Sequence, residues 1–219
     1  MTGKGAHRSN GSETVVLVHG LWVHGVWMRC MQRRIAARGY RVFCFSYPSM
    51  RRTLKENAAA LSAYCRALDH ETLHLVGHSL GGLVVLHAAA REPIANLGRL
   101  VLAGTPVAGS YSAQRLAKLP GGRVLLGKCG REWLHPEQQP DPSGREIGVI
   151  AGDLSFGLGR VIAPDLPAPN DGVVQVHETR VPGMRDHIVL HVSHTAMLFA
   201  PSVAREICTF LRSGHFTHN

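Results

Sequence analysis

The chain has 219 residues, of which 45% are hydrophobic and 18% are charged, and its formal net charge is +9 at pH 7. This balance excludes a disordered chain, and the length suits one domain with a substantial core. The sequence contains no run of eighteen apolar residues, which excludes a transmembrane helix. Lysine and arginine are scattered without an aromatic-interleaved basic patch, so we expect no nucleic-acid partner. We interpret the excess as surface charge, which predicts a weak attraction to anionic membrane surfaces or to acidic substrates.

Residues 1–13 are polar and glycine-rich and contain no apolar segment, so we expect no secretory signal. The five cysteines are odd in number, widely spaced and without any C-x-x-C pair. These two features favour a reducing compartment, and we expect a cytoplasmic protein. The fourteen histidines form no H-E-x-x-H or similar ligand pattern, so no metal site is expected.

Six apolar runs have the length and composition of buried strands: 14–18, 40–47, 73–76, 100–104, 146–151 and 187–192. Four segments have the apolar spacing of helices: 27–38, 54–68, 83–90 and 203–211. Strands that alternate with helices predict an α/β fold, with about six mostly parallel strands and helices on both faces. We expect a single domain over 14–213, between an N-terminal tail of 1–13 and a C-terminal tail of 214–219.

The stretch 107–145 differs from the rest of the chain because it is rich in proline and glycine and has one apolar segment, 124–126. This composition predicts an insertion of short helices and loops above the strand ends. Two interpretations stay open: a cap or mobile lid that shapes a substrate cleft, and a plain surface excursion.

The hexapeptide GHSLGG at 77–82 joins a predicted strand to a predicted helix. In this context G-x-S-x-G indicates a sharp turn that lifts the serine out at the carboxyl end of the sheet. Any side chain at Gly77 or Gly81 would collide with the neighbouring turn. Ser79 is therefore the candidate nucleophile, and its chemistry requires a base, an orienting acid and donors to an oxyanion.

His194 is the candidate base because it directly follows the last predicted strand, and functional groups collect at the carboxyl ends of parallel strands. His78 precedes the nucleophile and is expected to point away from it. Three other histidines lie before or within the last strand or too near the candidate acid: His187, His191 and His177.

Asp171 is the preferred acid, since it lies in an Asn-Asp-Gly turn that can present a carboxylate to the imidazole. Asp153, at the end of the preceding strand, is the main competitor, and Asp165 is third. The expected oxyanion donors are backbone N–H groups. One belongs to Leu80, and the other belongs to Leu21 or, next in order, to Trp22. These three side chains also suggest an apolar acyl pocket, with Trp22 as a substrate-pocket residue.

The chain order of Ser79, Asp171 and His194 resembles that of the α/β-hydrolase superfamily. The elbow, the His-Gly turn at 19–20, the Gly-Thr-Pro at 104–106 and the Asn-Asp-Gly-Val-Val at 170–174 carry the same resemblance. More narrowly, these motifs look like those of small bacterial lipases and esterases, and the resemblance spans 14–211. It implies a serine hydrolase that cleaves small-molecule or lipid carboxylic esters through an acyl-enzyme, without a cofactor.

Two departures from the family pattern bear on this expectation. The chain begins at what would be the third strand of the eight-stranded fold, so it resembles a minimal six-stranded core. It also lacks a Gly-Gly-Gly oxyanion loop, which favours longer or plain acyl chains. Thioesterase, amidase or acyltransferase activity would use the same residues, and a non-catalytic binding protein on a hydrolase scaffold is the alternative outside enzymes.

Overall fold

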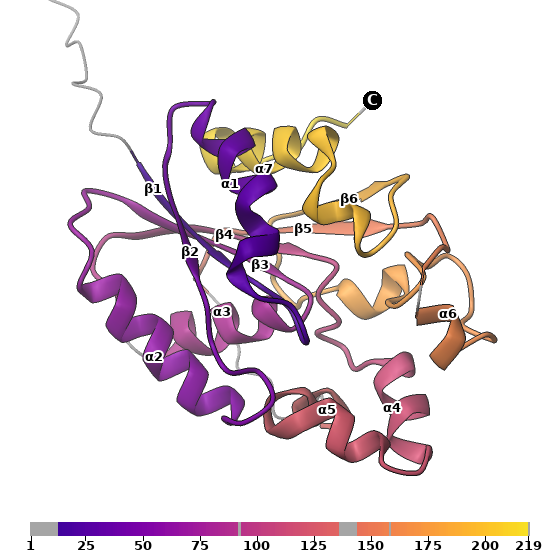
Figure 1. Ribbon diagram of the computed structural model, residues 1–219. Helices are drawn as coiled ribbons and strands as arrows, with labels where there is room; N and C mark the ends of the chain where they lie inside the picture. The colour runs from indigo at the N-terminus through magenta and orange to yellow at the C-terminus, as the bar shows by residue number, and fades with distance from the viewer. Residues whose placement is uncertain (1–12, 92, 136–143, 158, 219) are drawn as a thin grey trace, which may run out of the picture.

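The computed structural model describes residues 13–91, 93–135, 144–157 and 159–218. Six strands form one sheet in the order β2-β1-β3-β4-β5-β6, and every neighbouring pair is parallel (Figure 1). The strands are β1 (Thr14–Val18), β2 (Arg41–Phe45), β3 (Leu73–His78), β4 (Leu97–Ala103), β5 (Ile147–Gly152) and β6 (Asp186–Leu190). The prediction of an α/β fold with about six parallel strands is confirmed, and each expected run overlaps one strand.

Helices cover both faces of the sheet. α2 (Leu54–Arg66) and α3 (Leu80–Arg91) pack together on one face, whereas α1 (Arg29–Ala36) and α7 (Pro201–Ser213) pack together on the other (Figure 1). Two separate clusters of buried side chains fill the layers. One contains Leu61 and Leu83, and the other contains Ile35 and Phe210. The strands between them are hydrophobic on both faces, which explains why β1 and β5 read as continuous apolar runs.

The local sequence accounts for several helix ends. Thr53 caps α2 by accepting a hydrogen bond from the Glu56 backbone N–H, and the Glu56 carboxylate accepts one from Thr53 N–H in return. At the end of the chain, α7 begins at Pro201 and stops at Gly214, which is left-handed with φ 78°.

The remaining helices lie around the carboxyl ends of the strands. They are η1 (Gly25–Met28), α4 (Tyr111–Lys118), α5 (Gly122–Gly130), η2 (Arg131–Leu134), α6 (Gly159–Ile162), η4 (Val176–Thr179) and η5 (Ala196–Leu198). The insertion expected at 107–145 thus contains the short helices α4, α5 and η2, while its residues 136–143 lie outside the described residues. In the described ranges, no helix combines the length and the apolar character needed to cross a membrane.

The strand order places two loops side by side. β1 is hydrogen-bonded to β2 on one side and to β3 on the other, so the chain changes direction across the sheet at β1. Val18, the last residue of β1, lies opposite Gly77 of β3. In open parallel sheets, ligands bind at the carboxyl ends of the strands at such a reversal. The loop after β1 and the loop after β3 therefore meet where a site is expected.

Candidate active site

Ser79 occupies the turn between β3, which ends at His78, and α3, which begins at Leu80. Its φ is 55°, a left-handed conformation that is costly for a residue with a side chain. The Ser79 N–H donates to Ala103 O of β4 at 2.9 Å, and this bond ties the strained residue to the sheet. Strained residues held by surrounding structure are typical of functional turns.

The glycines on either side explain how the turn stays so tight. A Cβ at Gly77 would collide with the backbone of Gly82, and a Cβ at Gly81 would collide with the carbonyl oxygen of Val18. The collision expected at Gly77 is therefore with the following turn, as the sequence indicated. At Gly81 the obstacle is instead the end of β1. The two glycines let the first turn of α3 pack directly against the strands. This packing places Ser79 in the wall of the cavity.

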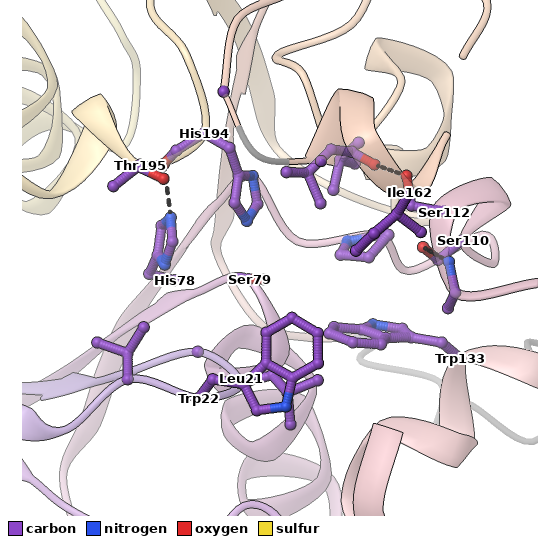
Figure 2. A pocket seen from close by; sticks show the side chains of 18 of the residues that line it. Leu21, Trp22, His78, Ser79, Ser110, Ser112, Trp133, Ile162, His194 and Thr195 are labelled. Carbon is purple, nitrogen blue, oxygen red and sulfur yellow. Dashed lines mark hydrogen bonds between the residues drawn. The ribbon is translucent and has the colours of Figure 1, made fainter. Parts of the chain in front are cut away.

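His194 and Asp171 form a buried pair. Nδ1 of His194 lies 2.7 Å from Oδ2 of Asp171, and the two side chains are only 10% and 1% exposed. The other carboxylate oxygen, Oδ1, accepts the N–H groups of Val173 at 2.9 Å and Val174 at 2.8 Å. Because the carboxylate is the acceptor, the Nδ1 proton of His194 is donated to it, and Nε2 is left as the basic nitrogen. The ring of His194 extends from its loop toward Ser79 (Figure 2).

The two competing aspartates have other partners. Asp153 lies 2.9 Å from Nδ1 of His191 on an exposed part of the surface. Asp165 accepts a hydrogen bond from the Tyr111 hydroxyl at 2.8 Å and forms an ion pair with Arg115 at 3.2 Å. The structure therefore brings Asp171 to His194 and places Asp153 and Asp165 elsewhere.

His78 lies in the same cavity as Ser79, whereas its place before the nucleophile predicted that it would point away. Its ring centroid is 4.8 Å from that of His194, and its Nε2 donates to the His194 carbonyl oxygen at 3.0 Å (Figure 2). Burial lowers the pKa of His78 to about 3, so the ring is neutral near pH 7. His78 is a neutral support beneath the His194 loop, and it does not point away from the site.

The loop after β1 is anchored by a stacked pair of rings. The centroids of His19 and Tyr47 are 4.5 Å apart, and burial lowers the pKa of His19. Tyr47 donates its backbone N–H to Nε2 of His19 at 3.2 Å and its hydroxyl to the His19 carbonyl oxygen at 2.8 Å. These bonds fix the backbone at the point where it leaves β1.

This loop passes close to the nucleophile. A Cβ at Gly20 would stand 3.0 Å from Cβ of Ser79, so only glycine fits there comfortably. Within the described residues, the backbone N–H groups of Leu21, Trp22 and Leu80 have no hydrogen-bond acceptor. Leu21 and Trp22 also line the cavity, whereas the Leu80 side chain is fully buried in the core.

A cavity of about 290 Å³ opens over Ser79 and His194 (Figure 2). Its wall is mainly apolar and comes from several loops and helices: Leu21, Trp22, Val23, Leu116, Leu126, Trp133, Phe156, Ile162, Val173, Val174 and Leu198. The hydroxyls of Ser110 and Ser112 are already engaged, by Ala113 N–H and Val173 O respectively. The described lining contains no lysine or arginine. Across the same described part of the chain, no group of three His, Cys, Asp or Glu side chains is arranged to hold a metal ion.

Several residues of the cavity wall were not predicted from the sequence. Trp133 is the only tryptophan of the 107–145 stretch, and so large an aromatic residue in an insertion rich in proline and glycine was a usable signal. Phe156 precedes α6 and Ile162 ends it; the sequence predicted no element in this region, so nothing marked these two residues.

Known proteins are similar to this chain in sequence and in fold. A hydrolase of 2-hydroxy-6-oxononadienedioate and 2-hydroxy-6-oxononatrienedioate from Paraburkholderia xenovorans (strain LB400) is 27% identical over 195 residues. The alignment covers 81% of this chain but only 59% of that relative, so the chain spans about three fifths of its length.

Two solved structures share the fold at low sequence identity. The mature lipase BlEst2 of Bacillus licheniformis has a TM-score of 0.75 and 17% identity, covering 94% of this chain and 93% of that one. A metagenomic carboxyl esterase has a TM-score of 0.66 and 21% identity, covering 90% and 74%. The profile of the alpha/beta hydrolase family matches residues 15–218, nearly the whole chain. The chain therefore belongs to the alpha/beta hydrolase family.

Proposed function

We propose that this hydrolase cleaves carboxylic esters through an acyl-enzyme, with Ser79 as nucleophile, His194 as general base and Asp171 as the orienting acid. The observation that carries the proposal is the 2.7 Å contact between Asp171 Oδ2 and His194 Nδ1 beside a strained Ser79. It leaves one basic nitrogen free at the same cavity as the serine hydroxyl. This is the arrangement that activates a serine for acyl transfer.

In the first half-reaction, Nε2 of His194 takes the proton of Ser79 as the serine oxygen attacks the ester carbonyl carbon. The carbonyl oxygen becomes an oxyanion, and the N–H groups of Leu80 and Leu21 are the proposed donors that stabilise it. The imidazolium then protonates the departing alkoxide, and the alcohol leaves. Water repeats the sequence on the acyl-enzyme and releases the acid. Asp171 stays ionised throughout and stabilises the imidazolium.

The cavity favours an ester whose acyl part is apolar and uncharged. Its wall consists largely of leucine, valine, isoleucine, tryptophan and phenylalanine side chains. Burying a carboxylate without a partner is strongly unfavourable, and the described lining offers no lysine or arginine. A dioate such as the one named for the Paraburkholderia relative carries two carboxylates, which makes it a poorer fit. It remains the second candidate because that relative is 27% identical.

Labelling with a fluorophosphonate, read by intact mass, tests the activated serine. We expect one adduct on the wild-type chain and none on Ser79→Ala or His194→Ala. Ser112→Ala is the matched control, because Ser112 also lines the cavity but donates its hydroxyl to Val173 O. It should be labelled like the wild type. A folded wild-type chain that takes no adduct would contradict the proposal.

The substrate is tested separately with p-nitrophenyl octanoate and a 2-hydroxy-6-oxo dioate. Faster turnover of the octanoate is expected. Preferred turnover of the dioate would replace the ester proposal with the second candidate, and the labelling result would still hold.

A further inference from the structure

Two residues with side chains adopt left-handed backbone at the same cavity. Ser79 has φ 55°, and Trp22, in the loop after β1, has φ 59°. The only other such residue in the described chain is Asn96, with φ 50°, in the turn before β4. Asparagine tolerates this conformation, but a tryptophan adopts it only when its surroundings hold it there.

The indole of Trp22 provides that hold. Its Nε1–H donates to the carbonyl oxygen of Leu125 in α5 at 2.9 Å, across 103 residues of chain. The preceding residue, Leu21, reaches the same helix, since its Cδ2 lies 3.4 Å from the position that a Cβ on Gly130 would take. Two consecutive residues of the loop after β1 therefore contact α5.

Burial does not explain the position of the Trp22 ring. The residue is 53% exposed, and its partner Leu125 is 51% exposed. A tryptophan kept half in solvent and in a strained backbone contributes little to the core. What it contributes is a directed hydrogen bond to α5.

The helix that receives this bond is itself held in place. Lys128 N–H donates to Met50 O at 3.0 Å. Gly127, with φ 64°, kinks α5 so tightly against Met50 that a Cβ there would stand 2.6 Å from the Met50 Cα. α5 thus offers the loop a fixed acceptor, which connects the loop after β1 to the segment after β2.

We propose that Trp22 is a positioning residue: its indole bond to α5 fixes the loop that presents the Leu21 N–H group to the oxyanion at Ser79. The inference rests on the proposed function, because it assumes that an oxyanion forms there. Donors stabilise an oxyanion only when they are held at the right place before the reaction. The close approach of Gly20 to Ser79 means that a small shift of the loop changes that distance directly.

Trp22→Phe tests the proposal, since it keeps one aromatic ring and removes the N–H donor together with the second ring of the indole. Trp27→Phe is the matched control: Trp27 is also 53% exposed, packs edge-on against Phe199 at 6.3 Å and does not line the cavity. With a p-nitrophenyl ester, Trp22→Phe should lower kcat roughly two- to tenfold, the effect of losing one hydrogen bond, and leave KM unchanged. Trp27→Phe should leave both constants at their wild-type values.

Amide hydrogen exchange supplies a readout that is independent of turnover. Residues 20–24 and 122–126 should both exchange faster in Trp22→Phe than in the wild type, and neither should change in Trp27→Phe. Wild-type exchange in both segments, or wild-type kcat, would overturn the role of Trp22. If the wild-type chain hydrolyses no ester, the proposed function fails, and the exchange of the two segments alone decides whether Trp22 holds the loop.

Discussion

Asp171 is bonded to His194 twice, once through its side chain and once through its backbone. Oδ2 lies 2.7 Å from Nδ1 of the ring, and the Asp171 carbonyl oxygen accepts the His194 backbone N–H at 2.8 Å. The backbone hydrogen bond therefore holds the two loops that carry these residues together, independently of the carboxylate contact. Removing the charge should change the chemistry while the backbone bond keeps the loops together.

Asp171→Asn should lower kcat by roughly 10³- to 10⁴-fold, because an amide cannot stabilise the imidazolium and favours the wrong tautomer of His194. Asp153→Asn is the control, since its carboxylate pairs with exposed His191. We expect wild-type kcat for that variant on a p-nitrophenyl ester. Equal loss in both variants, or loss only in Asp153→Asn, would reverse the assignment of the acid.

Much of the fold could be predicted because the strands are buried on both faces and read as apolar runs. The predicted ends of the strands were less accurate near the candidate site, where the chain leaves the sheet. The expected strand 40–47 stops at Phe45, since Tyr47 turns to bond His19. The expected strand 73–76 continues to His78, because Gly77 and His78 still pair with β4.

The candidate site could be predicted to the extent that its residues lie in turns that follow strands. Ser79, His194 and Asp171 each occupy a turn with a local signature. The contacts of Trp22 and His78 have no such signature. The partner of Trp22 lies 103 residues away in α5, whose glycines, Gly122, Gly127 and Gly130, are typical of helix breakers. The position of His78 depends on the His194 loop, 116 residues further on.

The stability of the fold should fall in acid because of His78. Its pKa is about 3 when folded and 6.5 when unfolded, since burial disfavours the charged ring. Between these values the unfolded chain binds more protons, so the folded state is most stable above about pH 6.5 and loses stability as the pH falls toward 3. One such histidine contributes a slope of at most about 1.4 kcal/mol per pH unit.

His78→Gln should flatten this dependence, measured as the urea midpoint between pH 7 and pH 4.5, because glutamine does not titrate. His177→Gln, at an exposed position, should keep the wild-type slope. The explanation fails if both variants lose stability in acid as steeply as the wild type does. The buried rings of His19 and His74 and the half-buried ring of His187, whose pKa values burial also lowers, account for the dependence that persists in His78→Gln.

Gly81→Ala should destabilise the fold by about 3 kcal/mol or more, because the new Cβ collides with backbone that cannot move without shifting β1. Gly130→Ala is the control in another helix. Its Cβ would meet only ordinary contacts, the nearest being Leu21 Cδ2 at 3.4 Å. Urea denaturation followed by circular dichroism compares the two. A Gly81→Ala variant as stable as Gly130→Ala would contradict the packing described for the elbow.

A substitution at Ala113 tests which acyl chains the cavity accepts, because Ala113 is buried on α4 and lines the cavity wall. Ala113→Phe places a ring in a space of about 290 Å³, so kcat/KM for an octanoate ester should fall. We expect a loss of roughly tenfold or more, with the acetate ester within about twofold of the wild type, since pocket volume is felt only by substrates that fill it. Ala63→Phe, on the exposed face of α2, should leave both esters unchanged. Equal losses for acetate and octanoate would mean that the acyl chain binds elsewhere, because a filled acyl pocket discriminates by length.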